Sequence, residues 1–522
     1  MRCLPAILLT LILISSSLAF AADVSADGDS FEVDGFVYSI IEGTDVSIIS
    51  YDGEFTVDFD IPGTVEYNTT TYHVRVLDFG IYSNIVETIN IQGEVMAAYT
   101  YVFASPNLSA IKINGSINGD NGYLRSDDGV LYTHNQSKLI MYPPKRAGTE
   151  YTLNANTIEV GMNAFSNCGL IRLVLDSNLA IINSGAFYPS HNLTEVVVPD
   201  VTSLTMIGTN AFYGCGNLTT MDLPWALSYI GPFAFEATGF SEVSIPDGVE
   251  FIGEGAFADC GNLTRFLSYN PVYQTDETGV LFHVNNDIRT LVQYPSGKDT
   301  KDYKIPDNVS NIAGYAFEGT RYLESIDMGD NLAVVPTVAF YNCPSLKTLD
   351  LGNVRVIEDM AFCRCRGLTE LDLPEGLTSI GYCAFNGIDI EALEIPASVT
   401  IIEEDAFSYC ERLKEVTIPE SSKVNLCSGV FYGCLALEKI TFNSKDVVMD
   451  EYSLEIGISD EDPATVELWV PSGYSVPENV SNDFTTIDVN YIGERPYPWV
   501  NLIGVFICAV VLIGILYGMR QV

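Results

Sequence analysis

Basic residues are scarce in this 522-residue sequence. Lysine and arginine together number 25 against 68 aspartates and glutamates, which gives a formal net charge of −43 at pH 7. A surface of that sign repels phosphate backbones and anionic lipid headgroups, so the composition excludes a nucleic-acid-binding protein. Cations and basic proteins are the partners that such a surface attracts. Acid content also keeps proteins soluble, so the charge by itself names no ligand.

Histidine is also rare, and the chain lacks the spacings that build a zinc site or a hydrolytic centre. No two of the four histidines stand at His-x-x-x-His, and no Cys-x-x-Cys pair occurs. The repeats described below contain no convergent nucleophile, base and orienting residue. We therefore predict that the protein is not an enzyme and holds no metal and no cofactor. The histidines are His73, His134, His191 and His283.

The two ends of the chain carry apolar segments. Residues 1–21 contain a basic residue, an apolar run and a closing Ala-Phe-Ala, which is typical of a signal peptide. Residues 499–518 contain no charge, and as a helix they would span about 30 Å, the thickness of the hydrocarbon core. We expect this segment to cross the membrane once, with residues 519–522 as a cytoplasmic tail. A buried core helix and a cleaved sorting signal are the alternatives.

Nine Asn-x-Ser/Thr triplets lie between these ends. They are expected in an exported, glycosylated ectodomain, although a chain rich in Asn, Ser and Thr also forms such triplets by chance. The nine acceptors are Asn68, Asn107, Asn114, Asn135, Asn192, Asn217, Asn262, Asn308 and Asn479.

A repeat with a period of 22 to 25 residues fills most of the chain. Its clearest marker is an Ala-Phe pair, with Val430-Phe431 as a conservative variant and with degenerate units at Ile81-Tyr82 and Val102-Phe103, which makes 13 rungs. The phenylalanines of the regular pairs are Phe165, Phe187, Phe212, Phe235, Phe257, Phe317, Phe340, Phe362, Phe385 and Phe407.

One unit, residues 368–385, shows how a repeat folds. It begins with Leu-x-x-Leu-x-Leu, in which the later apolar positions alternate with polar ones as in a half-buried strand. Pro374 then ends the strand because proline donates no ladder hydrogen bond. The remaining residues are too few for a long helix and must return the chain through short turns. A single unit cannot bury its own apolar residues, so the units must stack into a solenoid.

The succession Leu-x-x-Val-x-Ile-Pro, Val-x-x-Ile and Ala-Phe-x-x-Cys resembles the BspA-type leucine-rich repeat of microbial surface proteins. The resemblance covers most of residues 60–443. It implies a leucine-rich-repeat solenoid, a right-handed superhelix that is mainly β with short turns on its convex side. It also implies hairpin-like insertions, an N-terminal hairpin and a role in adhesion.

The period also defines the domain organisation. We assign residues 22–60 to an N-terminal cap hairpin and residues 61–442 to the solenoid. Its two insertions, near residues 120–145 and 270–298, share a Gly-Val-Leu-aromatic motif followed by Tyr-Pro. After Phe442 the period fades, so residues 443–494 are predicted to form a C-terminal cap and stalk.

The 12 cysteines would ordinarily suggest disulfides in an exported protein. Seven of them, however, stand three residues after a repeat phenylalanine, a core position at which cysteine acts as a small apolar side chain. Neighbouring rungs bring their Cα atoms near disulfide range, but parallel side-chain vectors oppose a bridge such as Cys343–Cys365. The seven are Cys168, Cys215, Cys260, Cys343, Cys365, Cys410 and Cys434.

One set of carboxylates, named here the acidic strip, is a candidate binding surface. The residue between the last two apolar positions of the strand points away from the core, and in four successive rungs it is acidic. Like charges about 5 Å apart on neighbouring strands cost free energy unless a cation or basic group lies among them. The strip would then bind a basic protein patch or divalent cations; the alternative is a solvated acidic face. It comprises Asp327, Asp350, Asp372 and Glu394, flanked by Glu370 and Glu415.

The combined pattern predicts a single-pass cell-surface protein with its N-terminal ectodomain outside the cell. A rigid solenoid displays wide surfaces without a closed pocket, which suits recognition of large partners. We expect the partner to be an extracellular protein or glycan of another cell, host or matrix. The alternative is a structural envelope or surface-coat component without a specific ligand.

Overall fold

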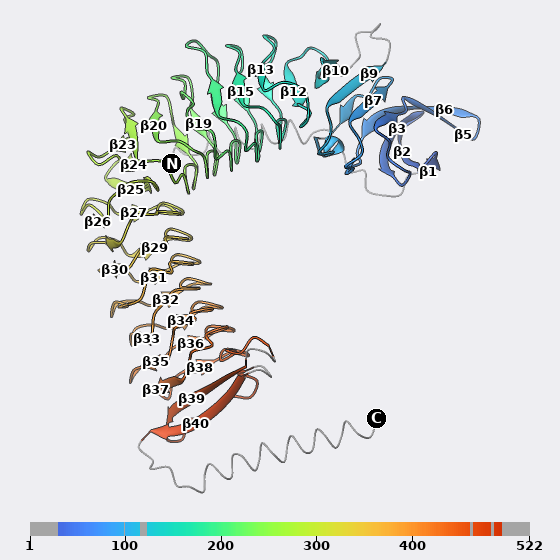
Figure 1. Ribbon diagram of the computed structural model, residues 1–522. Coiled ribbons are helices and arrows are strands. Elements are labelled where there is room, and N and C mark those ends of the chain that lie inside the picture. Colours follow the sequence, from blue (N-terminus) through green and yellow to red (C-terminus); the bar gives the residue numbers. More distant parts are fainter. Residues whose placement is uncertain (1–29, 99, 115–122, 460–462, 482–484, 493–522) are drawn as a thin grey trace, which may run out of the picture. The chain divides into compact units, whose positions relative to one another are not determined.

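The computed structural model describes residues 30–98, 100–114, 123–459, 463–481 and 485–492 (Figure 1). The predicted signal peptide, transmembrane segment and cytoplasmic tail, residues 1–21, 499–518 and 519–522, lie outside these ranges. Within them, no helix has the length and apolarity needed to span a bilayer. The described chain divides into two compact units. The first contains residues 30–135 and 143–146, and the second contains residues 136–142 and 147–492.

The first unit begins with a sheet of order β1-β2-β3-β6-β5, to which β8 adds beside β6. Its opening hairpin, β1 and β2, turns at Asp34-Gly35, both with positive φ, as a two-residue hairpin turn requires. This sheet extends past the predicted cap boundary at residue 60. Its strands are β1 (Ser30–Val33), β2 (Phe36–Glu42), β3 (Asp45–Tyr51), β5 (Thr64–Tyr67), β6 (Thr70–Leu77) and β8 (Ala97–Ala98).

Repeat-type strands appear in the same unit as a parallel ladder, β4 (Asp58–Ile61), β7 (Thr88–Gln92) and β9 (Ala110–Asn114). A short 3-10 helix, η1 (Thr100–Phe103), precedes β9. The predicted insertion near residues 120–145 contains the antiparallel hairpin β10 (Leu124–Asp127) and β11 (Val130–Thr133), which turns at Asp128-Gly129.

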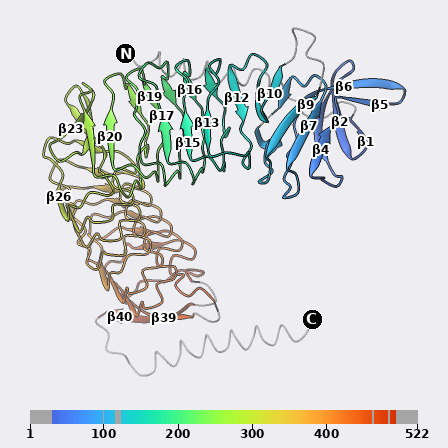
Figure 2. The same cartoon turned by 45° about the horizontal axis from the view of Figure 1, so that its top comes forward.

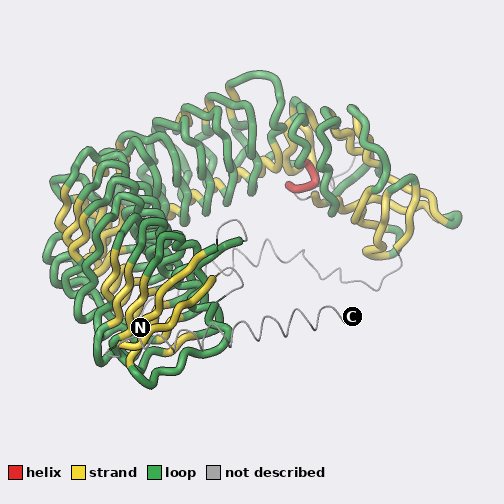
Figure 3. The backbone as a smooth tube through the Cα atoms, turned by 60° about the horizontal axis from the view of Figure 1, so that its bottom comes forward, coloured by secondary structure: helices red, strands yellow, loops and turns green. Residues whose placement is uncertain are grey.

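The second unit is a solenoid in which every rung contributes to parallel ladders, so that short strands alternate with loops along the chain (Figure 3). The first ladder is the strand predicted from Leu-x-x-Leu-x-Leu, and Figure 2 shows β13, β15 and β17 side by side in it. Its members are β13 (Glu150–Thr152), β15 (Arg172–Val174), β17 (Glu195–Val197), β20 (Glu242–Ile245), β22 (Arg265–Ser268), β26 (Asp302–Lys304), β28 (Ser325–Asp327), β30 (Thr348–Asp350), β33 (Ala392–Glu394), β35 (Glu415–Ile418), β37 (Lys439–Phe442), β39 (Ala464–Pro471) and β40 (Thr485–Ile492).

A second ladder runs through the Val-x-x-Ile part of each repeat, where the sequence predicted only short turns. Most of its strands have two residues, the second of which is buried, so even this short segment alternates. They are β12 (Lys138–Met141), β14 (Glu159–Val160), β16 (Ile181–Ile182), β18 (Met206–Ile207), β19 (Tyr229–Ile230), β21 (Phe251–Ile252), β27 (Asn311–Ile312), β29 (Val334–Val335), β31 (Val356–Ile357), β32 (Ser379–Ile380), β34 (Ile401–Ile402), β36 (Asn425–Leu426) and β38 (Val448–Met449).

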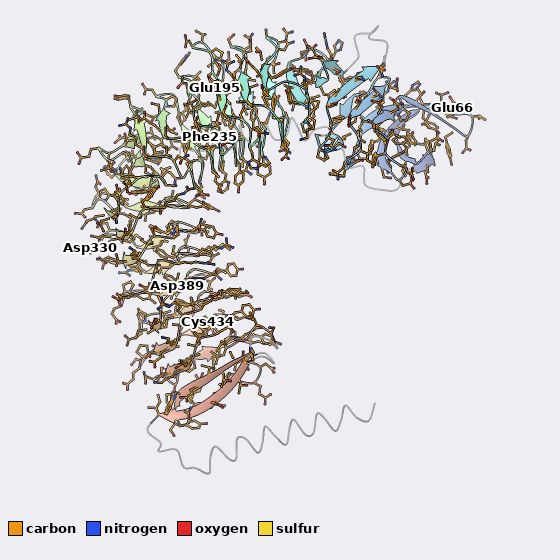
Figure 4. The ribbon with its side chains drawn as sticks, viewed as in Figure 1. Glu66, Glu195, Phe235, Asp330, Asp389 and Cys434 are labelled. Atoms are coloured by element: carbon orange, nitrogen blue, oxygen red, sulfur yellow. The ribbon has the colours of Figure 1, made fainter. Side chains whose placement is uncertain are left out.

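The Ala-Phe pairs form the third side of each rung and the centre of the core. The phenylalanine N–H donates to the carbonyl of the corresponding alanine in the next rung, for example Phe362 to Ala384 at 2.8 Å. The rings stack along the solenoid, with Phe362 5.0 Å from Phe340 and 5.3 Å from Phe385 between centroids. These spacings are close to the roughly 4.8 Å between paired strands. Phe235 in Figure 4 belongs to this column.

The structure corrects the assignment of three rungs. Tyr142 and Tyr294, inside the predicted insertions, donate from N–H to Ala164 and Ala316 and stack on the next phenylalanine, so each occupies a phenylalanine position. In the first unit Ile81 is fully buried and bonds to Val102 in the same way, whereas Tyr82 is 71% exposed. The degenerate pair is therefore Gly-Ile rather than Ile81-Tyr82.

The insertion near residues 270–298 contains an antiparallel meander that returns to the second ladder. It comprises β23 (Tyr273–Thr275), β24 (Leu281–Asn285) and β25 (Ile288–Gln293), and β25 pairs in parallel with β27. At the far end, β39 and β40 continue the first ladder after β37, so the segment predicted as a C-terminal cap extends the parallel sheet.

Each Ala-Phe pair is preceded by a residue with left-handed backbone. At this position φ lies between +52° and +64° from Asn163 to Gly429. Glycine and asparagine adopt such angles readily, but Phe233, Tyr315 and Val338 do not, and each such residue costs roughly 1–2 kcal/mol. We name this series the left-handed column. Its members are Asn163, Gly185, Asn210, Phe233, Gly255, Tyr315, Val338, Met360, Cys383, Asp405 and Gly429.

The seven repeat cysteines are buried, as predicted, and the ten cysteines that the structure describes are free thiols. Their role is not purely apolar, because most of the thiols donate to the carbonyl of the phenylalanine one rung earlier. Cys365 Sγ lies 3.0 Å from the carbonyl oxygen of Phe340, and Ser190 makes the equivalent bond to Phe165 at 2.6 Å. Burial raises the pKa of Cys260 to about 12, which keeps such a thiol protonated and able to donate.

We predict that serine replaces Cys365 better than alanine does. The hydroxyl of Cys365→Ser repeats the bond that Ser190 makes, whereas Cys365→Ala leaves the buried Phe340 carbonyl without this donor, at a cost of roughly 1–3 kcal/mol. Denaturant unfolding of both variants measures the difference. Equal losses of unfolding free energy would show that the thiol contributes only volume.

Candidate functional site

The acidic strip lies partly on the first ladder. Asp327 of β28 and Asp350 of β30 are direct partners in register, next to Lys304 of β26. Asp372 belongs to no strand, and β33, which carries Glu394, starts a separate sheet. The strand pairing of the first ladder is therefore interrupted at the rung of Asp372, and the four carboxylates of the strip do not share one sheet.

Two members of the strip already have partners within the protein. Lys304 Nζ lies 3.4 Å from an oxygen of Asp327. The other oxygen of Asp327 accepts the N–H of Gly329 at 2.7 Å, and Asp350 accepts the N–H of Gly352 at 3.0 Å. These two carboxylates thus fix the turns that end their strands.

The other members of the strip face solvent. Asp372, Glu394, Glu370 and Glu415 are exposed, and their carboxylates have no hydrogen-bond or ion-pair partner among the residues that the structure describes. These four, rather than the aspartates that stabilise turns, are the members of the strip available to a partner.

Ion pairs between neighbouring rungs were not anticipated from the sequence. Glu324 lies 2.6 Å from both Lys301 and Lys347, one rung to either side, and their hydrogen bonds lower the pKa of Glu324 to about 2. Arg172 likewise joins Glu150 and Glu195. The available signal was the alternation of charge sign at one strand position in consecutive repeats, which pairs in register once the rungs stack.

The nine predicted glycosylation acceptors are all exposed in the structure. The side-chain amides of Asn107 and Asn217 donate to backbone carbonyls of Asn84 and His191 at 2.7 and 2.6 Å. The other acceptors include Asn192, Asn262 and Asn308 of the second unit.

A groove of about 520 Å³ lies on the turn side of the solenoid, away from both ladders. Its lining includes residues of the left-handed column and residues directly after the repeat phenylalanines. We name it the turn-side groove. Its lining consists of Met162, Asn163, Ser184, Gly185, Tyr188, Thr209, Asn210, Tyr213, Phe233, Glu236 and Tyr315.

Aromatic rings dominate this groove. Tyr188 and Tyr213 of neighbouring rungs lie 5.2 Å apart, and Phe233 meets Tyr315 edge to face at 4.9 Å. Phe233 and Tyr315 are far apart in sequence, because the meander at residues 270–298 separates them. They meet across Gly255, where a Cβ atom would lie only 2.6 Å from the Phe233 ring.

Three carboxyl groups are gathered beside these rings. Burial raises the pKa of Glu236 to about 7 and that of Glu318 to about 8, and repulsion from Asp259 adds to both. Burial also raises the pKa of Asp259, which the charge of Arg321 opposes. Oε2 of Glu318 is buried without a hydrogen-bond partner in the described part of the chain.

The same carboxyl groups also raise the pKa values of the neighbouring tyrosines. The pKa of Tyr213 is raised first by Glu236 and then by burial, and that of Tyr315 by burial and by Glu318, Glu254 and Glu236. The carboxylates therefore lie close to the rings and create a negative potential in the groove.

A second groove, of about 500 Å³, includes Glu403, Glu404, Asp450 and Glu451. No group of three or more His, Cys, Asp or Glu residues within the described ranges has the arrangement needed to hold a metal ion.

Comparison with protein families identifies the repeat. The family described as the BspA type leucine-rich repeat region, with 6 copies, matches residues 148–275, 296–386 and 352–456. The chain belongs to this family. A search of curated protein sequences found no match.

Solved structures of bacterial proteins resemble the chain. A leucine-rich cell-surface protein of Faecalibacterium prausnitzii is 23% identical, with a TM-score of 0.48, covering 80% of this chain and 96% of its own. The pneumococcal vaccine antigen PcpA is 18% identical, with a TM-score of 0.48, covering 89% and 100%. A leucine-rich-repeat protein of Bacteroides ovatus is 20% identical, with a TM-score of 0.32, covering 88% and 99%.

The raised carboxyl pKa values predict a pH-dependent stability. Glu236 and Glu318 ionise near pH 4.5 in the unfolded chain but near pH 7 and pH 8 when folded. Their contribution to stability is complete below pH 4.5 and is lost as the pH rises through about 7 and 8. The melting temperature should therefore fall less between pH 5 and pH 8.5 in the variant Glu236→Gln/Glu318→Gln than in the wild type. Glu370→Gln/Glu415→Gln, which alters two exposed carboxylates, is the matched control and should keep the wild-type slope.

Proposed function

We propose that this chain is a cell-surface binding protein that displays its solenoid to an extracellular protein with a basic surface. The observation that carries the proposal is the row of exposed, unpartnered carboxylates, including Asp372 and Glu394, on a backbone held rigid by inter-rung hydrogen bonds. Such a row attracts basic partners over several ångströms and selects against acidic ones. The family, whose members include cell-surface proteins, supports the location.

An enzyme is not favoured by the geometry. Both grooves described above are open. The thiol of Cys427 lies beside Asp450 in the second groove, but burial and the charge of Asp450 raise the pKa of this thiol to about 11, which keeps it protonated and weakly nucleophilic near neutral pH. A glycan is the second candidate partner, because asparagine amides and aromatic rings line the turn-side groove. A coat component without a ligand is the competing function, and it predicts self-association of the chain in place of partner binding.

The partner is to be sought by presenting the full-length protein to arrays of extracellular proteins and glycans. We expect saturable binding to basic proteins, weakened by salt. Charge reversal by Asp372→Lys/Glu394→Lys should weaken that binding at least tenfold. Each substitution replaces a negative charge with a positive one, so the net charge of the row becomes more positive by four. Asp58→Lys/Asp60→Lys on strand β4 makes the same change of charge at exposed positions elsewhere and should leave binding within about twofold of the wild type. Equal effects of the two variants would contradict a role of the strip.

We also propose that residues 499–518 anchor the protein in the membrane after removal of residues 1–21. A transmembrane helix resists alkaline carbonate, whereas a peripheral protein is released. The full-length chain should stay in the carbonate pellet, and a chain ending at residue 494 should appear in the medium. Release of the full-length chain would exclude the anchor.

A further inference from the structure

The turn-side groove differs in chemistry from the acidic strip. The strip carries single exposed carboxylates on a flat ladder, whereas the groove combines ring faces with carboxyl groups that are partly buried. Tyr213, Phe233 and Tyr315 are each half-buried, so their rings offer part of their surface to a ligand. A cation bound here would interact with the faces of the aromatic rings and would also pair with a carboxylate.

Glycines of the left-handed column make room for the side chains that line the groove. A Cβ at Gly185 would lie 2.3 Å from Oδ1 of Asn163, and a Cβ at Gly255 would lie 2.6 Å from the ring of Phe233 and 3.4 Å from that of Tyr315. The missing side chains therefore allow the Asn163 amide and the two rings to take their positions in the groove.

Within the described ranges, no basic side chain lowers the pKa of Glu236 or Glu318. Glu236 lines the groove, and Asp259 and Glu318 lie near it; the pKa values of both glutamates respond to Asp259. Arg321 is the basic residue whose charge acts on this group, and it acts on Asp259. The buried Oε2 of Glu318 is an acceptor without a donor among the described residues.

We propose that the turn-side groove receives a cationic side chain, arginine or lysine, from a segment of a basic partner protein, with the cation between the aromatic rings and Glu236. The inference rests on the proposed function, since it specifies how a basic partner is held. Charge complementarity decides the occupant: an anionic ligand would meet three carboxyl groups, and a neutral sugar would leave their charges uncompensated.

Binding of this kind depends on pH in a defined direction. A cation favours the ionised form of Glu236 and Glu318, so its binding releases protons and strengthens as the pH rises through about 7 to 8. The other titratable groups of this region include Asp259, Glu254, Arg321, Tyr188, Tyr213 and Tyr315.

The probe is the tripeptide Gly-Arg-Gly, blocked at both ends, with Gly-citrulline-Gly as its neutral counterpart of the same shape. Both are titrated against the full-length protein by saturation-transfer NMR in 0.15 M salt. We expect the arginine peptide to bind at least tenfold more tightly than the citrulline peptide, and more tightly at pH 8.5 than at pH 5.5. Glu236→Gln and Tyr213→Ala should each weaken it at least fivefold, whereas Tyr213→Phe, which keeps the ring, should stay within threefold of the wild type.

Asp60→Asn removes one exposed charge from strand β4, outside the groove and the acidic strip, and is the control for general attraction. Equal binding of the two peptides, or an equal loss in Asp60→Asn and Glu236→Gln, would overturn the proposal. A neutral oligosaccharide would also overturn the proposal if Tyr213→Ala abolished its binding and if it bound without displacing the arginine peptide. That result would place a glycan in the groove and the arginine peptide elsewhere.

If the groove variants still capture the partner found in the arrays, the groove proposal fails while the proposed function stands. If no partner is found but the arginine peptide discriminates, the proposed function fails instead.

Discussion

The N–H of each repeat phenylalanine donates to the alanine carbonyl of the next rung, and the rest of the solenoid depends on this contact. It fixes the distance between rungs at the point where the chain is most tightly folded, and the rings stack at the same spacing. Because alanine has only a methyl group, two rungs approach closely enough for both interactions. The two ladders then add hydrogen bonds at the same interval. Apolar burial, backbone pairing and ring stacking thus all require one repeat distance.

The same tight turn explains where the surface becomes chemically distinctive. Left-handed backbone before each Ala-Phe pair is inexpensive for glycine and asparagine and costly for Phe233, Tyr315 and Val338. The surrounding stack holds these residues in place. Phe233 and Tyr315 also line the turn-side groove. The strained backbone positions therefore supply two of the aromatic rings of the groove.

Carboxylates on the strand ladders and carboxylates on the turn side are stabilised in different ways. On the ladders, Glu324 and Arg172 join residues of both neighbouring rungs, and the turns take up Asp327 and Asp350. The other four carboxylates of the acidic strip are exposed. On the turn side, burial keeps Glu236 and Glu318 partly protonated near neutral pH, which reduces the repulsion that three neighbouring carboxylates would otherwise cause.

The sequence by itself determined the repeat, the first ladder and the cysteine column, because periodic burial leaves a periodic pattern of Leu, Ala-Phe and Cys that needs no knowledge of distant contacts. It missed Tyr142 and Tyr294 as core members, since a tyrosine at a phenylalanine position is recognised only once its N–H is seen to bond to the next alanine. The tertiary structure alone decided which carboxylates stay free and which rings meet. Phe233 and Tyr315 are brought together across Gly255 by stacking that bypasses the inserted meander, and contacts of that kind depend on the register of rungs rather than on spacing along the chain.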